Sequence, residues 1–217
     1  MSLVTFSELL NSPAPEGVYV TDTSFILGAG AGQSKDCEKK YKIALKLKDY
    51  LLKNKVGLVY TGLIKNEATH NLREVLFKTS IKGSLKRFPE LIKRYTDAKD
   101  GGLKEIAKSG YIKSFEYALG KNGKELDREL QNIFFGCTYV STEKMKPKPD
   151  WTEVSKIMAT YGLDSTDAMI LNFSISQNTF KGLITMDSDF RFCADVPNFE
   201  IVVPDYFKSL EGYQVLK

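Results

Sequence analysis

Five acidic residues stand at positions where carboxylates in an α/β protein gather around a ligand: Asp22, Glu67, Asp167, Asp187 and Asp189. Three of them directly follow β-rich runs, and two fall within helical segments. In an open parallel sheet, ligands bind beyond the carboxyl ends of the strands. Carboxylates crowded there repel and raise one another's pKa, and a divalent cation relieves the repulsion. The pattern therefore predicts a site for Mg²⁺ or Mn²⁺, which activates water and neutralises charge on a phosphodiester.

Asp164 and Asp167 are three residues apart and share one helix face near its N-terminus. Asp164 is placed to cap the helix, because an aspartate at that position accepts hydrogen bonds from free backbone N–H groups. Asp167 lies a turn further in and is followed at once by the apolar run 168–170. It is therefore the better candidate for a ligand.

The segments around these acids alternate between strand and helix. Residues 18–21 and 56–60 predict strands, a helix is expected over 37–54, and the segment after residue 62 predicts a helix that carries Glu67. Later strands are expected at 182–186 and 199–203, and two helices before them, 150–162 and 164–177, begin at capping aspartates. This order predicts a three-layer α/β/α fold with a central parallel sheet of four or five strands.

The middle of the chain interrupts this alternation. Residues 79–149 predict two or three helices, near 88–98, 103–119 and 123–135, separated by glycine and proline. We therefore expect a single domain over 1–217, with its core in 17–78 and 150–208 and a helical insertion at 79–149.

The insertion is also basic. Residues 78–113 carry ten basic side chains against four acidic ones, so the rest of the chain contributes −2 to the net charge of +4. A basic segment on a mildly acidic body suits a partner that carries phosphates, although a solvated lysine-rich helix face gives the same pattern. The residues we select as candidates for contact with such phosphates are Lys86, Arg87, Lys93 and Arg94.

Other features narrow the function. The three cysteines are far apart and form no CxxC pair, which indicates a reducing compartment, and no apolar run is long enough to span a membrane. The N-terminus lacks the pattern of a signal peptide, so a cytoplasmic location is expected. His70 is the only histidine, and we expect it to lie at the surface or to support the site rather than to act in nucleophilic catalysis. The glycine-rich stretch 28–35 fits neither nucleotide-binding fingerprint and predicts a mobile loop near the site.

Four blocks of the sequence, in order, resemble the PIN-domain family of metal-dependent ribonucleases. Residues 18–27 resemble the family's opening strand and first aspartate, and 58–67 resemble its second strand and the glutamate on the helix that follows. Residues 167–170 are similar to its Asp-Ala motif, and 183–190 to its Thr-x-Asp-x-Asp-Phe signature. The blocks lie within 18–76 and 151–207, a little over half of the chain.

The resemblance implies hydrolysis of RNA that leaves a 5′-phosphate and a 3′-hydroxyl. It implies Mg²⁺ or Mn²⁺ held by Asp22, Asp167 and Asp187, with Asp189 and Glu67 close by. It also implies supporting hydrogen bonds from two further residues, Ser24 and Thr185. An antitoxin-like protein inhibitor and a homodimer are further partners to test.

The insertion departs from the compact members of the family, such as the toxins of toxin–antitoxin pairs, and leaves the target RNA open. Two rival functions remain. One is a phosphatase of the haloacid-dehalogenase kind, which would need an aspartate where Ser24 stands. The other is a non-catalytic RNA-binding module, against which the complete set of acids counts.

Overall fold

The computed structural model describes residues 3–84, 112–142 and 150–209. The chain divides into two compact units. The first combines residues 1–67 with 133–217, and the second comprises residues 68–132. The sequence predicted a single domain with a helical insertion. The insertion's boundaries at 79 and 149 stay a prediction.

The first unit is built around a parallel sheet of six strands in the order β1-β6-β5-β2-β3-β4. The strands are β1 (Leu3–Thr5), β2 (Val18–Thr21), β3 (Gly57–Tyr60), β4 (Thr138–Tyr139), β5 (Phe180–Ile184) and β6 (Glu200–Val203). The α/β class and the parallel sheet are confirmed, with one strand more than the four or five expected. The two strands that the sequence did not predict, β1 and β4, are the two at the sheet's edges.

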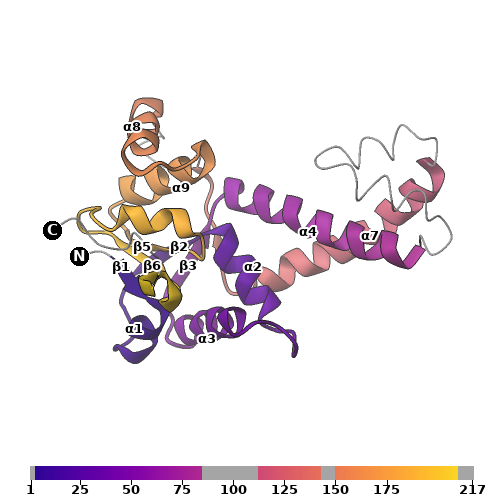
Figure 1. The fold of residues 1–217 in the computed structure, drawn as a ribbon, viewed down its shortest axis with the longest axis horizontal. Helices are drawn as coiled ribbons and strands as arrows, with labels where there is room; N and C mark the ends of the chain where they lie inside the picture. The colour runs from indigo at the N-terminus through magenta and orange to yellow at the C-terminus, as the bar shows by residue number, and fades with distance from the viewer. Residues whose placement is uncertain (1–2, 85–111, 143–149, 210–217) are drawn as a thin grey trace. The chain divides into compact units, whose positions relative to one another are not determined.

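Helices cover both faces of this sheet (Figure 1). The helices α1 (Phe6–Asn11), α2 (Thr23–Ala31) and α3 (Lys39–Lys53) pack together on one face, and α8 (Trp151–Tyr161) and α9 (Ser165–Ser176) lie on the other. This separation follows from right-handed crossovers, because the chain moves one way along the sheet from β1 to β2 and on to β4, and the opposite way from β4 to β5. The direction reverses between β2 and β5, which is where α/β sheets bind ligands.

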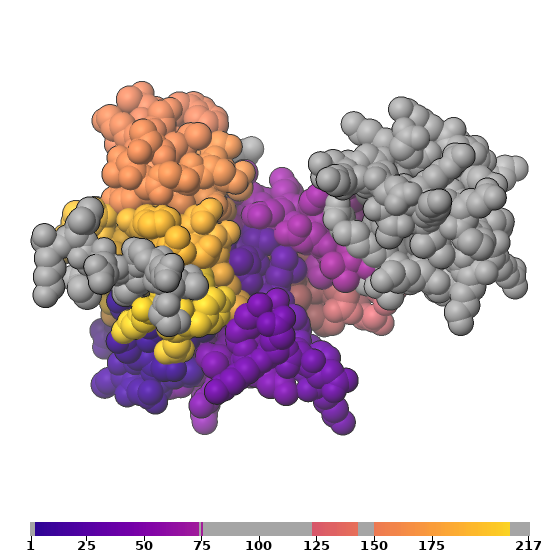
Figure 2. Space-filling model, viewed as in Figure 1, coloured from indigo at the N-terminus to yellow at the C-terminus, as the bar shows by residue number. Residues whose placement is uncertain are grey.

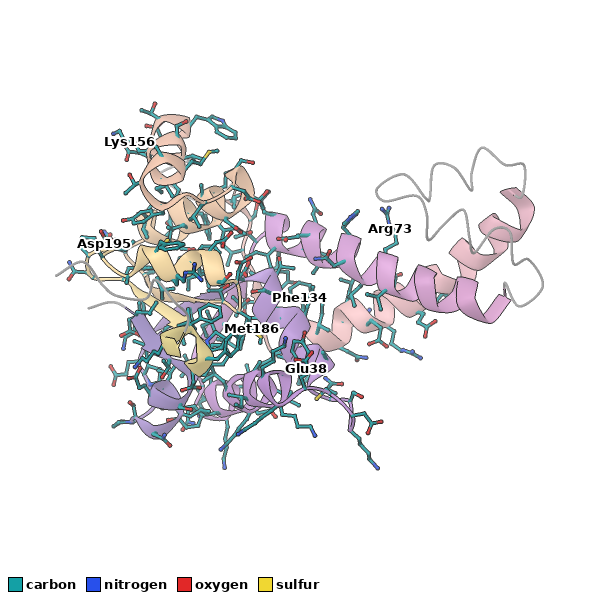
Figure 3. All side chains as sticks on the ribbon, in the orientation of Figure 1. Glu38, Arg73, Phe134, Lys156, Met186 and Asp195 are labelled. Carbon is teal, nitrogen blue, oxygen red and sulfur yellow. The ribbon has the colours of Figure 1, made fainter. Side chains whose placement is uncertain are left out.

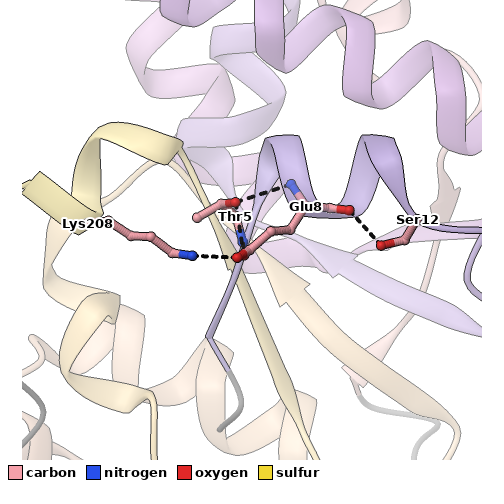
Figure 4. Close-up of polar contacts among 4 residues, drawn as sticks. All are labelled: Thr5, Glu8, Ser12 and Lys208. Carbon is pink, nitrogen blue, oxygen red and sulfur yellow. Dashed lines mark hydrogen bonds and ion pairs between the residues drawn. The ribbon is translucent and has the colours of Figure 1, made fainter.

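The first and last strands of the chain's described residues lie side by side in this unit. β1 pairs with β6, and Figure 2 shows the indigo and yellow segments in one continuous body. Thr5 and Glu8 form a capping box at the start of α1, in which each side chain bonds the other's backbone N–H. Lys208 Nζ donates to Glu8 Oε1 at 2.5 Å, so the helix near the N-terminus is held by a residue 200 positions later (Figure 4).

The expectation of a loop at 28–35 is wrong for residues 28–31, which belong to α2, whereas residues 32–35 form the turns that follow it. The glycines let α2 approach its neighbours closely. A β-carbon on Gly28 would collide with Met186, which lies against α2 (Figure 3), and one on Gly30 would lie 2.6 Å from Ile133 Cγ2. Glycine lowers helix stability by about 1 kcal/mol relative to alanine. Close packing against other elements offsets that cost here.

The second unit contains most of two long helices. α4 (Gly62–Ser84) begins in the first unit, and α7 (Ile112–Ile133) ends there. The sequence predicted a break between two helices at 119–123, which is wrong because α7 continues through Gly120 and Gly123. The helix predicted at 88–98 lies outside the described residues. Across the described ranges, no helix has both the length and the apolarity that crossing a membrane requires.

The remaining predicted elements are confirmed with small shifts. α8 begins after the capping residue Asp150 and ends at Gly162, whose φ of 70° is the left-handed conformation of a helix terminus. β5 ends at Ile184, two residues earlier than expected. Thr185 and Met186 therefore belong to the segment that follows the strand and leads to Asp187.

Candidate active site

The register of the two central strands brings Asp22 beside Thr185. Thr21 on β2 is level with Ile184 on β5, and the ladder continues one step further, where the Asp22 N–H donates to the Ile184 carbonyl at 2.9 Å. The Thr185 N–H is held in turn by the carbonyl of Val202 on β6 at 3.0 Å. The backbone at the switch point is thus fixed by sheet hydrogen bonds on both sides.

A hydrogen-bond network then fixes the carboxylate of Asp22. Its Oδ2 accepts from Ser24 Oγ at 2.5 Å and from Thr185 Oγ1 at 2.8 Å. Each hydroxyl is oriented by a backbone N–H, from Met186 to Ser24 at 2.8 Å and from Asp187 to Thr185 at 2.9 Å. Ser24 and Thr185 therefore both donate to the same oxygen of the aspartate, and their supporting role in a metal site stays a prediction.

Asp22 is a buried carboxylate, with 3% of its surface exposed. Burial raises its pKa above the ordinary value, and the hydrogen bonds from Ser24 and Thr185 act in the opposite direction. A buried charge requires either paired groups or a cation. The hydroxyls around Oδ2 supply part of that compensation, but none of them carries a positive charge.

Glu67 is joined to the same region from α4. Thr23, the first residue of α2, donates from Oγ1 to Glu67 Oε2 at 2.8 Å. Glu67 is exposed as a residue, but partial burial of its carboxylate raises its pKa, and the charges of Asp22, Asp164 and Asp187 raise it further. Glu67 therefore belongs electrostatically to the cluster although it comes from a different helix.

The pKa of the Asp167 carboxyl is shifted strongly upwards. Burial, followed by the charges of Asp22, Asp164, Asp187 and Glu67, raises its pKa to about 8. Asp164 is the helix cap expected from the sequence, because its Oδ1 accepts from the Asp167 N–H at 2.9 Å. Carboxylates from four separate segments of the chain are thus near enough to oppose one another's ionisation.

Asp187 and Asp189 lie on the 3-10 helix segment after β5. Asp187 caps this segment, and its Oδ1 accepts from the Asp189 N–H at 2.9 Å. Asp187 is half-buried and contributes to the repulsion on Asp167, whereas Asp189 is exposed. Of the two, Asp187 is therefore the better placed to act with Asp22.

The carboxylates do not form a ready-made metal cage. Within 3–84, 112–142 and 150–209, no group of three or more His, Cys, Asp or Glu residues is arranged to hold a metal ion. The donor set nevertheless fits a hard cation, because Mg²⁺ commonly binds through one or two carboxylates and keeps several waters. Asp22 fits such a role, since the hydrogen bonds from Ser24 and Thr185 converge on Oδ2 and fix the orientation of the carboxylate.

The remaining candidates from the sequence are four basic residues and the single histidine. Lys86, Arg87, Lys93 and Arg94 are outside the described residues, so their predicted role in RNA binding stays a prediction. His70 is exposed, and its Nδ1 lies 3.3 Å from a guanidinium nitrogen of Arg73 on the same helix. Figure 3 labels Arg73 on α4.

Two threonines at the site were missed by the sequence analysis. Thr23 holds Glu67, and Thr61, at the end of β3, is buried with its hydroxyl unpaired within the described part of the chain. The polar run from Asp22 to Ser24 is a signal for Thr23. The contact itself spans 44 positions, and no local pattern reveals it.

Comparison with known proteins adds little. No protein-family model and no curated protein matches the chain. Among solved structures, it is similar to a chain in the crystal structure of VapBC2 from Rickettsia felis bound to a DNA fragment from their promoter. The identity is 11%, the TM-score is 0.45, and the match covers 87% of this chain and 99% of that one. At this identity and TM-score, the likeness indicates no function for this chain.

Proposed function

We propose that this protein is a metal-dependent endoribonuclease whose active site is the carboxylate cluster at the switch point of the sheet. One observation carries the proposal. Burial, together with the charges of carboxylates from four separate segments, raises the pKa of Asp167 to about 8. Such repulsion destabilises a fold unless a ligand compensates it, and perturbed carboxylates in this position are typical of functional sites.

The proposed ligand is Mg²⁺ or Mn²⁺, held by Asp22, Asp167 and Asp187 with water completing its coordination. When bound, the cation would activate water and neutralise charge that develops on the phosphodiester. Asp22 is fixed for this role by Ser24 and Thr185. Asp189, exposed beside Asp187, would act as an auxiliary ligand.

Glu67 would act on water rather than on the metal. Its carboxylate is held from one side by Thr23, and its pKa is raised by its surroundings, which makes it a better proton acceptor. Hydrolysis of RNA at this site would leave a 5′-phosphate and a 3′-hydroxyl.

The test is a ribonuclease assay with single-stranded RNA in Mg²⁺, in Mn²⁺ and in chelator. We expect cleavage that requires metal and falls by at least about 100-fold in Asp22→Asn and Asp187→Asn, a loss in the range for one preorganised electrostatic group. Asp36→Asn, which changes an exposed aspartate outside the cluster, is the matched control and should cleave normally. RNA cleavage that persists in both cluster variants would refute the mechanism.

A phosphatase of the haloacid-dehalogenase kind is the main alternative. That chemistry needs a second aspartate two residues after the first, and Ser24 instead donates its hydroxyl hydrogen bond to Asp22. Hydrolysis of a phosphomonoester without RNA cleavage would favour the phosphatase. RNA binding without either activity would favour a non-catalytic module.

The remaining expectations belong with this proposal. RNA as the partner, a cytoplasmic location, an antitoxin-like inhibitor and a homodimer stay predictions. Size-exclusion chromatography with light scattering tests the homodimer directly, and the same sample serves the nuclease assay.

A further inference from the structure

A group of aromatic side chains lies at the same edge of the sheet as the carboxylates. Tyr60 and Tyr139 are the last residues of β3 and β4 and stand opposite each other in register. Their ring centroids are 5.6 Å apart, and the other neighbour of Tyr60 is Phe134, stacked at 4.0 Å with 27° between the ring planes. We call Tyr60, Phe134 and Tyr139 the aromatic group.

The group has a buried base and an open end. Phe134 is 7% exposed, whereas Tyr139 is 52% exposed, although the hydrophobic effect favours covering a ring of this size. The backbone beneath it is fixed, because the Val140 N–H donates to the Tyr60 carbonyl at 2.9 Å. Tyr139 is therefore an exposed ring on a rigid support.

The open ring lies close to the proposed active site. β4 is two strands from β2, so Tyr139 stands roughly 10 Å along the edge from Asp22, at about 4.8 Å per strand. Its hydroxyl is 3.5 Å from where a β-carbon on Gly62 would lie, and Gly62 is the first residue of the helix that carries Glu67.

Charge decides what can bind there. The carboxylate cluster repels the phosphates of a nucleic acid. Close to the cluster, a nucleic acid therefore needs contacts that do not involve its phosphates. A nucleobase is neutral and flat, and base–aromatic stacking tolerates any sequence. We propose, resting on the proposed nuclease function, that Tyr139, backed by Tyr60 and Phe134, stacks a nucleobase of single-stranded RNA that flanks the phosphodiester to be cleaved.

The test measures binding separately from cleavage. Short fluorescein-labelled single-stranded RNA is titrated against protein carrying Asp22→Asn, which prevents hydrolysis, and fluorescence anisotropy gives Kd. Adding Tyr139→Ala should raise Kd by about 5-fold to about 100-fold, the range for loss of one stacked base. Tyr139→Phe keeps the ring and should stay within about twofold of the parent. Trp151→Ala removes a ring that is 66% exposed at the start of α8 and should not change Kd.

Two further measurements keep the test decisive. If Tyr139→Ala unfolds, Tyr139→Leu keeps an apolar strand residue without an aromatic face and should show the same loss. RNA containing 2-aminopurine should lose fluorescence on binding the parent and keep it on binding the Tyr139 variant. An unchanged Kd in the Ala or Leu variant, equal losses in Phe and Ala, or no RNA binding by the parent would each overturn the stacking proposal.

The stacking proposal and the proposed nuclease function can be refuted separately. On the otherwise native protein, Tyr139→Ala should raise KM and leave kcat nearly unchanged, as expected for binding that is uniform along the reaction. Metal-dependent cleavage with no effect at Tyr139 refutes the stacking alone. Binding that depends on Tyr139, without cleavage, refutes the nuclease alone.

Discussion

Replacing Asp167 with asparagine should make the metal-free protein more stable at alkaline pH. In the folded protein the pKa of Asp167 is raised from 3.8 to about 8, so folding favours its protonated form. Its contribution to stability is therefore full below pH 3.8 and is lost as the pH rises towards about 8. Asparagine has nearly the same shape and never ionises, so it avoids this loss.

The size of the effect follows from the same pKa. At about 1.4 kcal/mol for each pH unit between 3.8 and about 8, the upper limit is about 6 kcal/mol. Asp167 is partly exposed and salt screens the repulsion, so we expect roughly 2–3 kcal/mol at pH 9. The dipole of α9 favours a charge in its first turn by about 0.3–1 kcal/mol, which is too little to reverse the sign.

The assay is urea denaturation of both proteins in chelator from pH 4 to pH 9, followed by circular dichroism. The difference in free energy of unfolding should be near zero at pH 4 and grow with pH. Adding Mn²⁺ should then stabilise the wild type more than Asp167→Asn, because only a ligand that binds the folded state shifts the equilibrium. A difference that does not depend on pH would refute the raised pKa of Asp167, and Asp36→Asn should show no difference from the wild type.

Three other changes test parts of the structure. Thr23→Val removes the hydrogen bond to Glu67 and should lower kcat/KM for RNA about tenfold, through loss of about 1.5 kcal/mol. Because that hydrogen bond lowers the pKa of Glu67, its loss should also move the acidic limb of the pH–rate profile to higher pH. An unchanged profile would show that Glu67 takes no part in the reaction. Gly136→Ala would place a β-carbon 2.6 Å from a leucine side chain at a φ of 79°, and should lower the free energy of unfolding by about 3 kcal/mol. Gly162→Ala has a similar φ of 70° but open space around the new β-carbon, and should lower it by about 1 kcal/mol. Equal losses would show that the close contact at Gly136 has no effect. Thr5→Ala deletes the cap of α1 and should lower the unfolding free energy by about 1 kcal/mol in the same denaturation experiment, and no change would contradict the capping role.

The parts of the site that follow strands were predictable from the sequence. Asp22 and Asp187 come directly after short apolar runs, and a parallel sheet brings the carboxyl ends of its strands to one edge. Asp164 was predictable as a cap, because the residue type and its position at a helix start suffice. These inferences depend on local pattern and on one general property of α/β sheets.

The features that the sequence did not predict correctly depend on contacts between residues distant in the chain. α2 was taken for a loop because glycine disfavours helix locally, and only its close approach to residues such as Ile133 makes that helix stable. β1 and β4 contain three and two residues, too few for a periodic pattern. Thr23 and Glu67 meet only because α2 and α4 follow neighbouring strands, which nothing in either segment's composition indicates.

The hydrogen bond between Thr185 and Asp22 joins residues 163 positions apart, which has a consequence for the order of folding. Chains emerge from the ribosome with the N-terminal part first, so Asp22 is synthesised long before the strand that completes its surroundings. Contacts this distant in sequence also form slowly, because the loop between them must close first. A nascent chain therefore carries an incomplete site throughout most of its synthesis. The proposed activity would arise only when β5 joins β2, so the topology itself delays any hydrolysis until β5 has been synthesised.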